Sequence, residues 1–148
     1  MLRTTYKHLN RIQKGSFAEA YAKMAFALEG FEVYTPEYDD RGIDFLIRNG
    51  AGKHFCVQVK ATCESVNPFI YADKFDDSSE FLLCAVRLVD GKAPEIYLAR
   101  GSDWKVEKEC LHKNLGGGKA GAYYELRFSR RYSASLSKHS FEQYVVSL

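Results

Sequence analysis

The stretch CVQVKAT, residues 56–62, places two polar side chains within an otherwise apolar β-strand. Side chains of a strand alternate between its two faces, so Gln58 and Lys60 share one face while Val57 and Val59 share the other. Lysine is almost never fully buried without a partner. The two polar residues therefore need an explanation that packing alone does not give.

A second predicted strand, IDFLIR, precedes this stretch across the turn NGAG. The turn residues predict that the two strands form a hairpin. Asp44 lies on one face of the first strand, and Phe45 lies on the other. Folding the hairpin brings Asp44 close to residues 57–58. Whether it stands directly opposite Gln58 depends on the loop register, which the sequence leaves open by one residue.

If Asp44 stands opposite Gln58, a carboxylate, an amide oxygen and an ammonium converge. Mg²⁺ prefers oxygen ligands, usually one or two carboxylates together with waters and substrate phosphate oxygens. Asp44 would then anchor the metal, with the Gln58 side chain and the Val59 carbonyl as further ligands. Lys60 would orient the attacking water or stabilise charge on the phosphorane. This is the arrangement that metal-assisted phosphodiester hydrolysis requires.

The chain of 148 residues is long enough to bury one core, and we expect a single domain over residues 1–148. Its formal charge of +2 implies no polyanionic partner by itself. The four cysteines lack any C-x-x-C pair, so zinc-knuckle and thioredoxin interpretations fail on spacing, and we expect reduced, mostly buried thiols. Without a signal-like or membrane-spanning apolar run, the sequence predicts a cytoplasmic protein with no membrane partner.

Further elements follow from hydrophobic periodicity and turn residues. We expect a helix over residues 15–29 with a stripe of Phe17, Tyr21, Met24 and Leu28. The order of elements predicts a mixed α/β sandwich. The expected strands are residues 31–36, 43–48, 53–62, 80–89, 94–99 and 123–128, with helices in residues 101–113 and 137–148 and a flexible loop at GGGKAGA.

Gly42-Ile43-Asp44, then a 13-residue gap and Gln58-Val59-Lys60, after a helix carrying Glu19, resembles the PD-(D/E)XK nuclease superfamily. This superfamily includes restriction enzymes, Holliday-junction resolvases and a branch of homing endonucleases. The resemblance implies an α/β fold of the restriction-endonuclease-like type, with a mixed central β-sheet flanked by helices. It also implies a Mg²⁺-dependent endodeoxyribonuclease in which Mn²⁺ substitutes. Asp44, Gln58, Lys60 and Glu19 match its catalytic positions, and Asp44, Gln58, Val59 and Glu19 would hold the metal.

The sequence departs from this pattern where Gln58 replaces an acid and Ile43 replaces a proline. Each residue also has a simpler interpretation. Asp44 could begin a strand after a turn, Gln58 could be half-exposed, and Lys60 could extend along the surface to water. Ser16-x-x-Glu19 fits a helix capping box, which would give Glu19 a purely local role.

The acidic loop before Asp44, with Glu37, Asp39 and Asp40, is interpreted as a solvated turn rather than a ligand source. Two basic segments fit sequence-independent contact with a phosphate backbone. DNA is the expected partner, and a homo-oligomer, dimer or tetramer, would allow both strands to be cut. The alternative is an inactive domain of the same fold that binds nucleic acid or a protein. The basic residues expected to bind nucleic acid are Lys7, Arg11, Lys14, Arg130 and Arg131.

Overall fold

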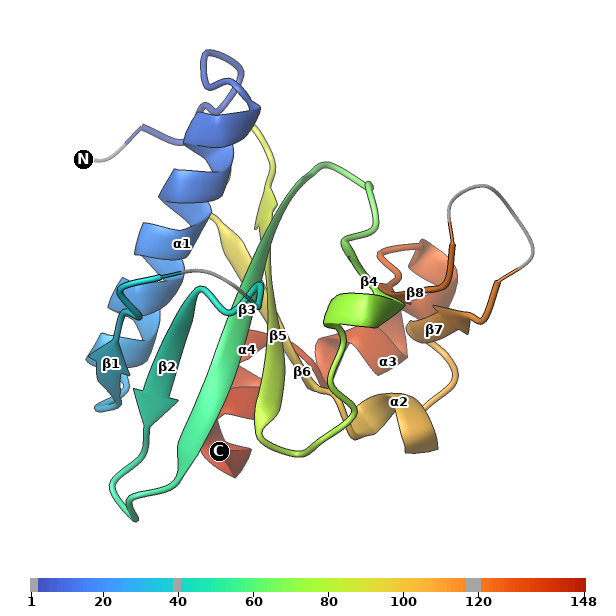
Figure 1. Ribbon diagram of the computed structural model, residues 1–148. Helices are drawn as coiled ribbons and strands as arrows, with labels where there is room; N and C mark the ends of the chain where they lie inside the picture. Colours follow the sequence, from blue (N-terminus) through green and yellow to red (C-terminus); the bar gives the residue numbers. More distant parts are fainter. Residues whose placement is uncertain (1–2, 39–40, 117–120) are drawn as a thin grey trace.

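The computed structural model describes residues 3–38, 41–116 and 121–148. Its centre is a five-stranded mixed sheet with the order β1-β2-β3-β5-β6 (Figure 1). Neighbouring strands are antiparallel except for β3 and β5, which run parallel. The strands are β1 (Glu32–Tyr34), β2 (Phe45–Arg48), β3 (His54–Cys63), β5 (Phe81–Leu88) and β6 (Glu95–Arg100).

A second, three-stranded antiparallel sheet has the order β4-β8-β7. It consists of β4 (Phe69–Tyr71), β7 (Leu111–Asn114) and β8 (Tyr123–Leu126). Of these, only β8 corresponds to a predicted strand. The segment that returns the chain from β3 to its parallel neighbour β5 thus contains β4 and a 3₁₀ turn at Ala72–Lys74.

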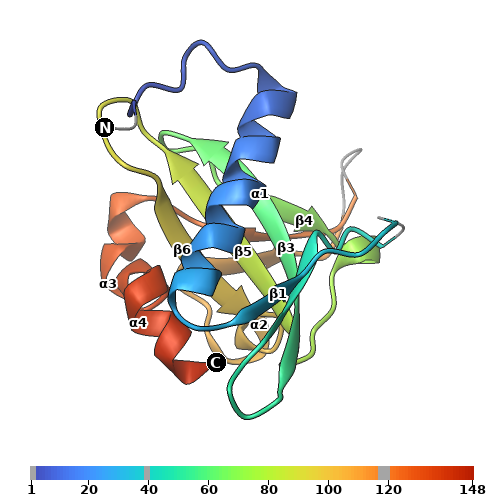
Figure 2. The ribbon, with the colours of Figure 1, turned by 90° about the vertical axis from the view of Figure 1, so that its left-hand side faces the viewer.

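The long helix α1 (Arg11–Leu28) covers one face of the central sheet together with the short helix α4 (Phe141–Tyr144), as Figure 2 shows. The other face packs against the small sheet, α2 (Asp103–Val106) and α3 (Ser133–Ser137). The central strand β5 is buried over almost its whole length because it has a hydrophobic cluster on each side. The expected mixed sheet flanked by helices is therefore confirmed, with a small sheet as an added part of one layer.

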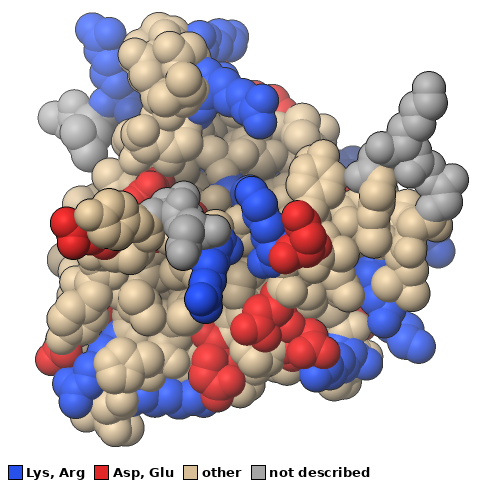
Figure 3. Space-filling view, viewed as in Figure 1, with Lys and Arg blue, Asp and Glu red and all other residues tan. Residues whose placement is uncertain are grey.

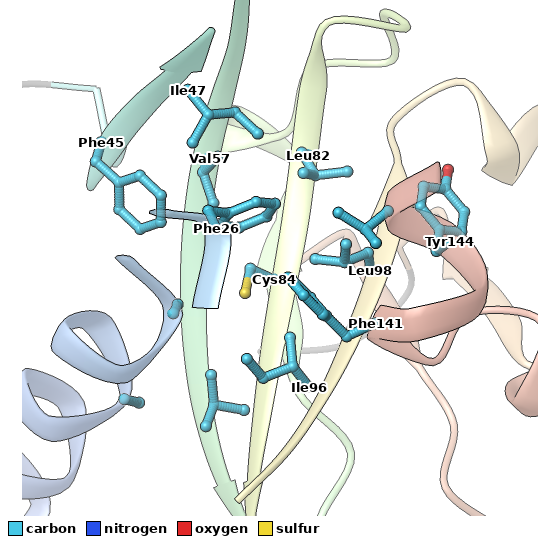
Figure 4. Packing of buried hydrophobic residues seen from close by; sticks show 14 of the residues in the cluster. Phe26, Phe45, Ile47, Val57, Leu82, Cys84, Ile96, Leu98, Phe141 and Tyr144 are labelled. Carbon is cyan, nitrogen blue, oxygen red and sulfur yellow. The ribbon is translucent and has the colours of Figure 1, made fainter. Parts of the chain in front are cut away.

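The face of α1 that packs on the sheet agrees with only half of the predicted stripe, since Phe17 and Tyr21 pack against the core. Ala18, Ala22 and Phe26 are fully buried, whereas Met24 and Leu28 are 48% and 81% exposed. Alanine side chains let the helix approach the strands closely, and the buried Phe26 then fills the remaining space. Figure 4 shows Phe26 among the apolar side chains of the sheet, close to Phe45, Val57 and Phe141.

The beginning of α1 also differs from the prediction. Asn10 caps the helix: its side-chain oxygen accepts from the Gln13 amide at 2.9 Å, and the Gln13 side chain accepts from the Asn10 amide at 2.9 Å. The capping-box interpretation of Ser16 and Glu19 is therefore wrong, because these residues lie within the helix. A reciprocal cap satisfies two backbone amides that have no partner inside the helix.

Candidate functional site

Asp44 stands where β2 begins, and the strand register brings it to the middle of β3. Phe45 pairs with Val57 as the first residue of β2, so Asp44 lies just before the paired stretch and beside the middle of β3. The Asp44 amide donates to the Val57 carbonyl at 2.9 Å, and its carboxylate oxygen Oδ2 accepts from the Val59 amide at 2.6 Å. Asp44 thus contacts the residues on both sides of Gln58.

The same geometry orients the carbonyl of Val59. In a β-strand the amide and the carbonyl of one residue point toward the same side. Since the Val59 amide points to the Asp44 carboxylate, the Val59 carbonyl also faces the side from which β2 approaches. A carboxylate and a main-chain oxygen therefore belong to one edge of β3.

Gln58 is only 4% exposed, and its side-chain oxygen Oε1 is buried without a hydrogen-bond partner in the described part of the chain. Gly42 packs against the other end of the same amide: a Cβ at position 42 would lie 3.1 Å from Gln58 Nε2. Gly42 has a φ of +73°, which favours glycine. Glycine therefore permits both the backbone turn and the close approach to Gln58.

A groove of about 590 Å³ opens over Gln58 and Lys60, between the first turns of α1 and β4. Its lining contains the cations Arg11, Lys14, Lys60 and Lys74 and, among the described residues, no carboxylate. In Figure 3 this face is hollowed, with basic side chains near the hollow and an acidic group below it. A groove lined with cations favours a ligand that carries phosphate groups.

Asp44 and Glu19 are not part of that lining. Asp44 accepts a hydrogen bond from the amide of Val59, which lies between the lining residues Gln58 and Lys60 but is not itself part of the lining. Glu19 forms an ion pair with Lys23 at 2.6 Å, and the Lys23 ammonium lies 5.6 Å from the ring centre of Phe45. The Glu19–Lys23 pair therefore lies near Phe45, the residue that follows Asp44 in the chain. The described contacts do not join Glu19 to Gln58.

The predicted nucleic-acid contacts divide into two groups. Arg11 and Lys14 line the groove, as just described. Lys7 is 89% exposed at its side chain and pairs with Asp90 at 3.4 Å, while Arg130 and Arg131 are exposed in a 3₁₀ turn after β8, outside the groove lining.

Sequence reasoning missed Lys74, which stands beside three aspartates and therefore looked like part of an acidic loop. It also missed β4, whose Phe69 and Tyr71 form one wall of the groove. Glu37 is exposed, in keeping with a turn, whereas Asp39 and Asp40 and most of the GGGKAGA loop lie outside the described residues.

Two solved structures similar to this chain are a homing endonuclease and a Holliday junction resolvase. A bacterial homing endonuclease, I-Ssp6803I, aligns with a TM-score of 0.56 at 17% identity, covering 93% of this chain and 91% of its own. Hjc, a Holliday junction resolvase from the archaeal hyperthermophile Archaeoglobus fulgidus, aligns with a TM-score of 0.52 at 13% identity, covering 80% and 87%. No protein-family model and no curated protein matches the sequence.

These two likenesses define the fold class. The chain has the restriction-endonuclease-like fold that the sequence resemblance implied. No helix within the described ranges has both the length and the apolar character needed to cross a membrane.

Proposed function

We propose that the protein is a metal-dependent endonuclease that hydrolyses phosphodiester bonds of DNA. The observation that carries the proposal is the buried Gln58 oxygen without a partner in the described part of the chain. Gln58 lines a cationic groove, and Asp44 is hydrogen-bonded to the residues on both sides of Gln58. A buried polar atom without a partner costs free energy, on the order of 1–3 kcal/mol, so it calls for a ligand. The nuclease fold of the similar structures supports the same conclusion.

The oxygen atoms at this place fit a hard divalent cation such as Mg²⁺, for which Mn²⁺ would substitute. Asp44, the Gln58 side chain and the Val59 carbonyl would hold it, with Glu19 as a fourth group once released from Lys23. When bound, the cation would polarise the scissile phosphate and lower the pKa of a coordinated water.

The remaining roles belong to the chain itself. Lys60 lines the groove on the same strand face as Gln58, and its ammonium would stabilise negative charge that develops on the phosphate. Arg11, Lys14 and Lys74 surround this position and would hold the DNA backbone without regard to sequence. The Asp44 side chain is fixed by the Val59 amide, so the carboxylate needs little reorganisation on binding.

The test is plasmid nicking with Mg²⁺ or Mn²⁺, with and without EDTA. Asp44→Asn and Lys60→Ala should abolish nicking while DNA binding persists, and Lys138→Ala, an exposed lysine outside the groove, serves as the matched control. Asparagine keeps an oxygen that can accept from Val59, so the variant tests the charge rather than the fold. Full nicking by Lys60→Ala would refute the proposed mechanism.

A second candidate is a domain of this fold that binds nucleic acid or a protein without cleaving anything. The neutral amide of Gln58, in place of an acid, favours it because an amide oxygen binds Mg²⁺ more weakly than a carboxylate does. Binding without nicking across duplex, branched and single-stranded DNA would support this candidate.

Cutting both strands of a duplex requires two copies of the proposed site, so we further propose a symmetric homo-oligomer. Sedimentation of the protein with and without DNA tests this.

A further inference from the structure

Glu107 and Cys110, three residues apart, meet a side chain distant in sequence, His139, beside the β6 edge of the central sheet. Glu107 follows α2, Cys110 precedes β7, and His139 lies between α3 and α4. One ligand atom from each residue lies within 4.8 Å of the other two. The His139 ring also contacts the carbonyl of Leu98 on β6, the edge strand three positions from β2. At about 4.8 Å per strand that separation is roughly 14 Å, so this cluster is distinct from the Asp44 site.

The hydrogen bonds of His139 determine which ring nitrogen can bind a cation. Nδ1 lies 2.8 Å from the Leu98 carbonyl, which can only accept, so Nδ1 carries a proton. In the neutral ring Nε2 then holds a lone pair, and it faces the Glu107 oxygen Oε2 at 2.7 Å. Two acceptors face each other, and only a proton or a metal ion between them makes the contact favourable. A histidine whose other nitrogen donates to a main-chain carbonyl is oriented as metal-bound histidines usually are.

Cys110 adds a sulfur to the same group. The thiol is fully buried, 3.6 Å from Glu107 Oε1 and 3.0 Å from the Ser135 hydroxyl. The Ser135 hydroxyl also contacts Glu107 Oε1. Burial raises the pKa of the Cys110 thiol to about 12, so the thiol stays protonated near neutral pH unless a metal ion displaces the proton.

We propose that Glu107, Cys110 and His139 bind one zinc ion, with the Ser135 hydroxyl or a water in the fourth position. A set of imidazole, thiolate and carboxylate ligands suits Zn²⁺ and does not suit Mg²⁺, which prefers oxygen. The ion would join the C-terminal helical segment to the α2–β7 connection. Its role is therefore structural, and it does not depend on nuclease activity.

The test begins with the metal content of the intact protein, purified without added chelator and then reloaded with Co²⁺. We expect about one zinc ion per chain, and a cobalt spectrum with the intense near-ultraviolet band of a thiolate ligand. Cys110→Ala should lose that band, while Cys84→Ala should keep it, since Cys84 is equally buried but lies in the other cluster. Replacing a ligand should weaken Co²⁺ binding by more than the roughly 10–100-fold that loss of an outer-shell partner costs.

Two results would overturn the proposal: a protein with neither bound zinc nor any cobalt spectrum, or a cobalt spectrum without the thiolate band. The former would mean that a proton bridges Glu107 and His139. If Cys110→Ala does not fold, the wild-type spectrum and that of Glu107→Gln decide the question. These measurements are independent of DNA cleavage, so an inactive protein with bound zinc would refute only the proposed nuclease.

Discussion

Replacing Gln58 by glutamate tests whether this position faces a cation. Side chains directly opposite on antiparallel strands have Cβ atoms about 5 Å apart. At an effective dielectric constant of about 20, two carboxylates at that distance repel by about 3 kcal/mol. Lys60, two residues along the same strand face and about 7 Å away, offsets about 2 kcal/mol of this repulsion. With the cost of burying a charge at a 4% exposed position, Gln58→Glu should destabilise the metal-free protein by about 1–3 kcal/mol.

Mg²⁺ should reverse this loss. A ligand that binds only the folded state stabilises it by about 2.7 kcal/mol at 100 times its dissociation constant. Because the variant adds a carboxylate to the proposed ligands, a given Mg²⁺ concentration should stabilise Gln58→Glu more than wild type. Urea unfolding with and without Mg²⁺ measures both quantities.

Gln58→Leu is the control, since it removes the amide oxygen without adding charge and should show no stabilisation by Mg²⁺. Equal Mg²⁺ effects on wild type, Gln58→Glu and Gln58→Leu would refute the assignment of Gln58 to a cation site, whatever the nicking assay gives.

Three further predictions follow from the packing and the groove. Phe26→Ala should lower the free energy of unfolding by about 3–5 kcal/mol, while Leu28→Ala, at an 81% exposed position, should change it by less than about 0.5 kcal/mol. Urea unfolding measures both variants, and similar losses of stability would contradict the observed helix face. Gly42→Ala should cost about 1–2 kcal/mol and reduce nicking because it strains a positive φ and pushes on Gln58, whereas Gly50→Ala, whose Cβ meets nothing within 4 Å, should affect neither. Lys74→Ala should weaken DNA binding and, if Lys74 contacts one phosphate, reduce the steepness of log affinity against log salt concentration by about 0.9. An unchanged slope would show that Lys74 does not contact the DNA backbone.

The hairpin was predictable because it is local. Alternation and the turn residues place Asp44 near Gln58 within one residue of register, and the structure shows Asp44 bonded to Val57 and Val59, on both sides of Gln58. The resemblance to the PD-(D/E)XK superfamily implied the fold class, which the similar structures confirm.

Two of the four predicted stripe residues, Met24 and Leu28, were wrong for a physical reason, whereas Phe17 and Tyr21 do pack against the core. Hydrophobic periodicity weights large side chains, so Met24 and Leu28 outweighed Ala18 and Ala22 in the sequence. In the structure the helix packs closely on the sheet, and small side chains such as those of Ala18 and Ala22 allow this close contact.

The strands β4 and β7 were missed because they are short: each has three or four residues and pairs with β8, which is distant in sequence from β4. No local pattern predicts such a partner. The groove wall that β4 supplies, and the position of Lys74 beside it, therefore emerged only from the tertiary structure.

β3 continues to Cys63, well past Val57, which pairs with the first residue of β2. Within the described residues no strand pairs with β3 on that side after Val57. An unpaired strand edge is a template on which another chain can add and aggregate. The Asp44 carboxylate occupies the first exposed amide of this edge, and Lys60, next along the strand, carries a charge that discourages strand addition. The groups proposed for catalysis would thus also protect this edge of β3 against aggregation by strand addition, and variants at these positions should be checked for solubility before their activity is interpreted.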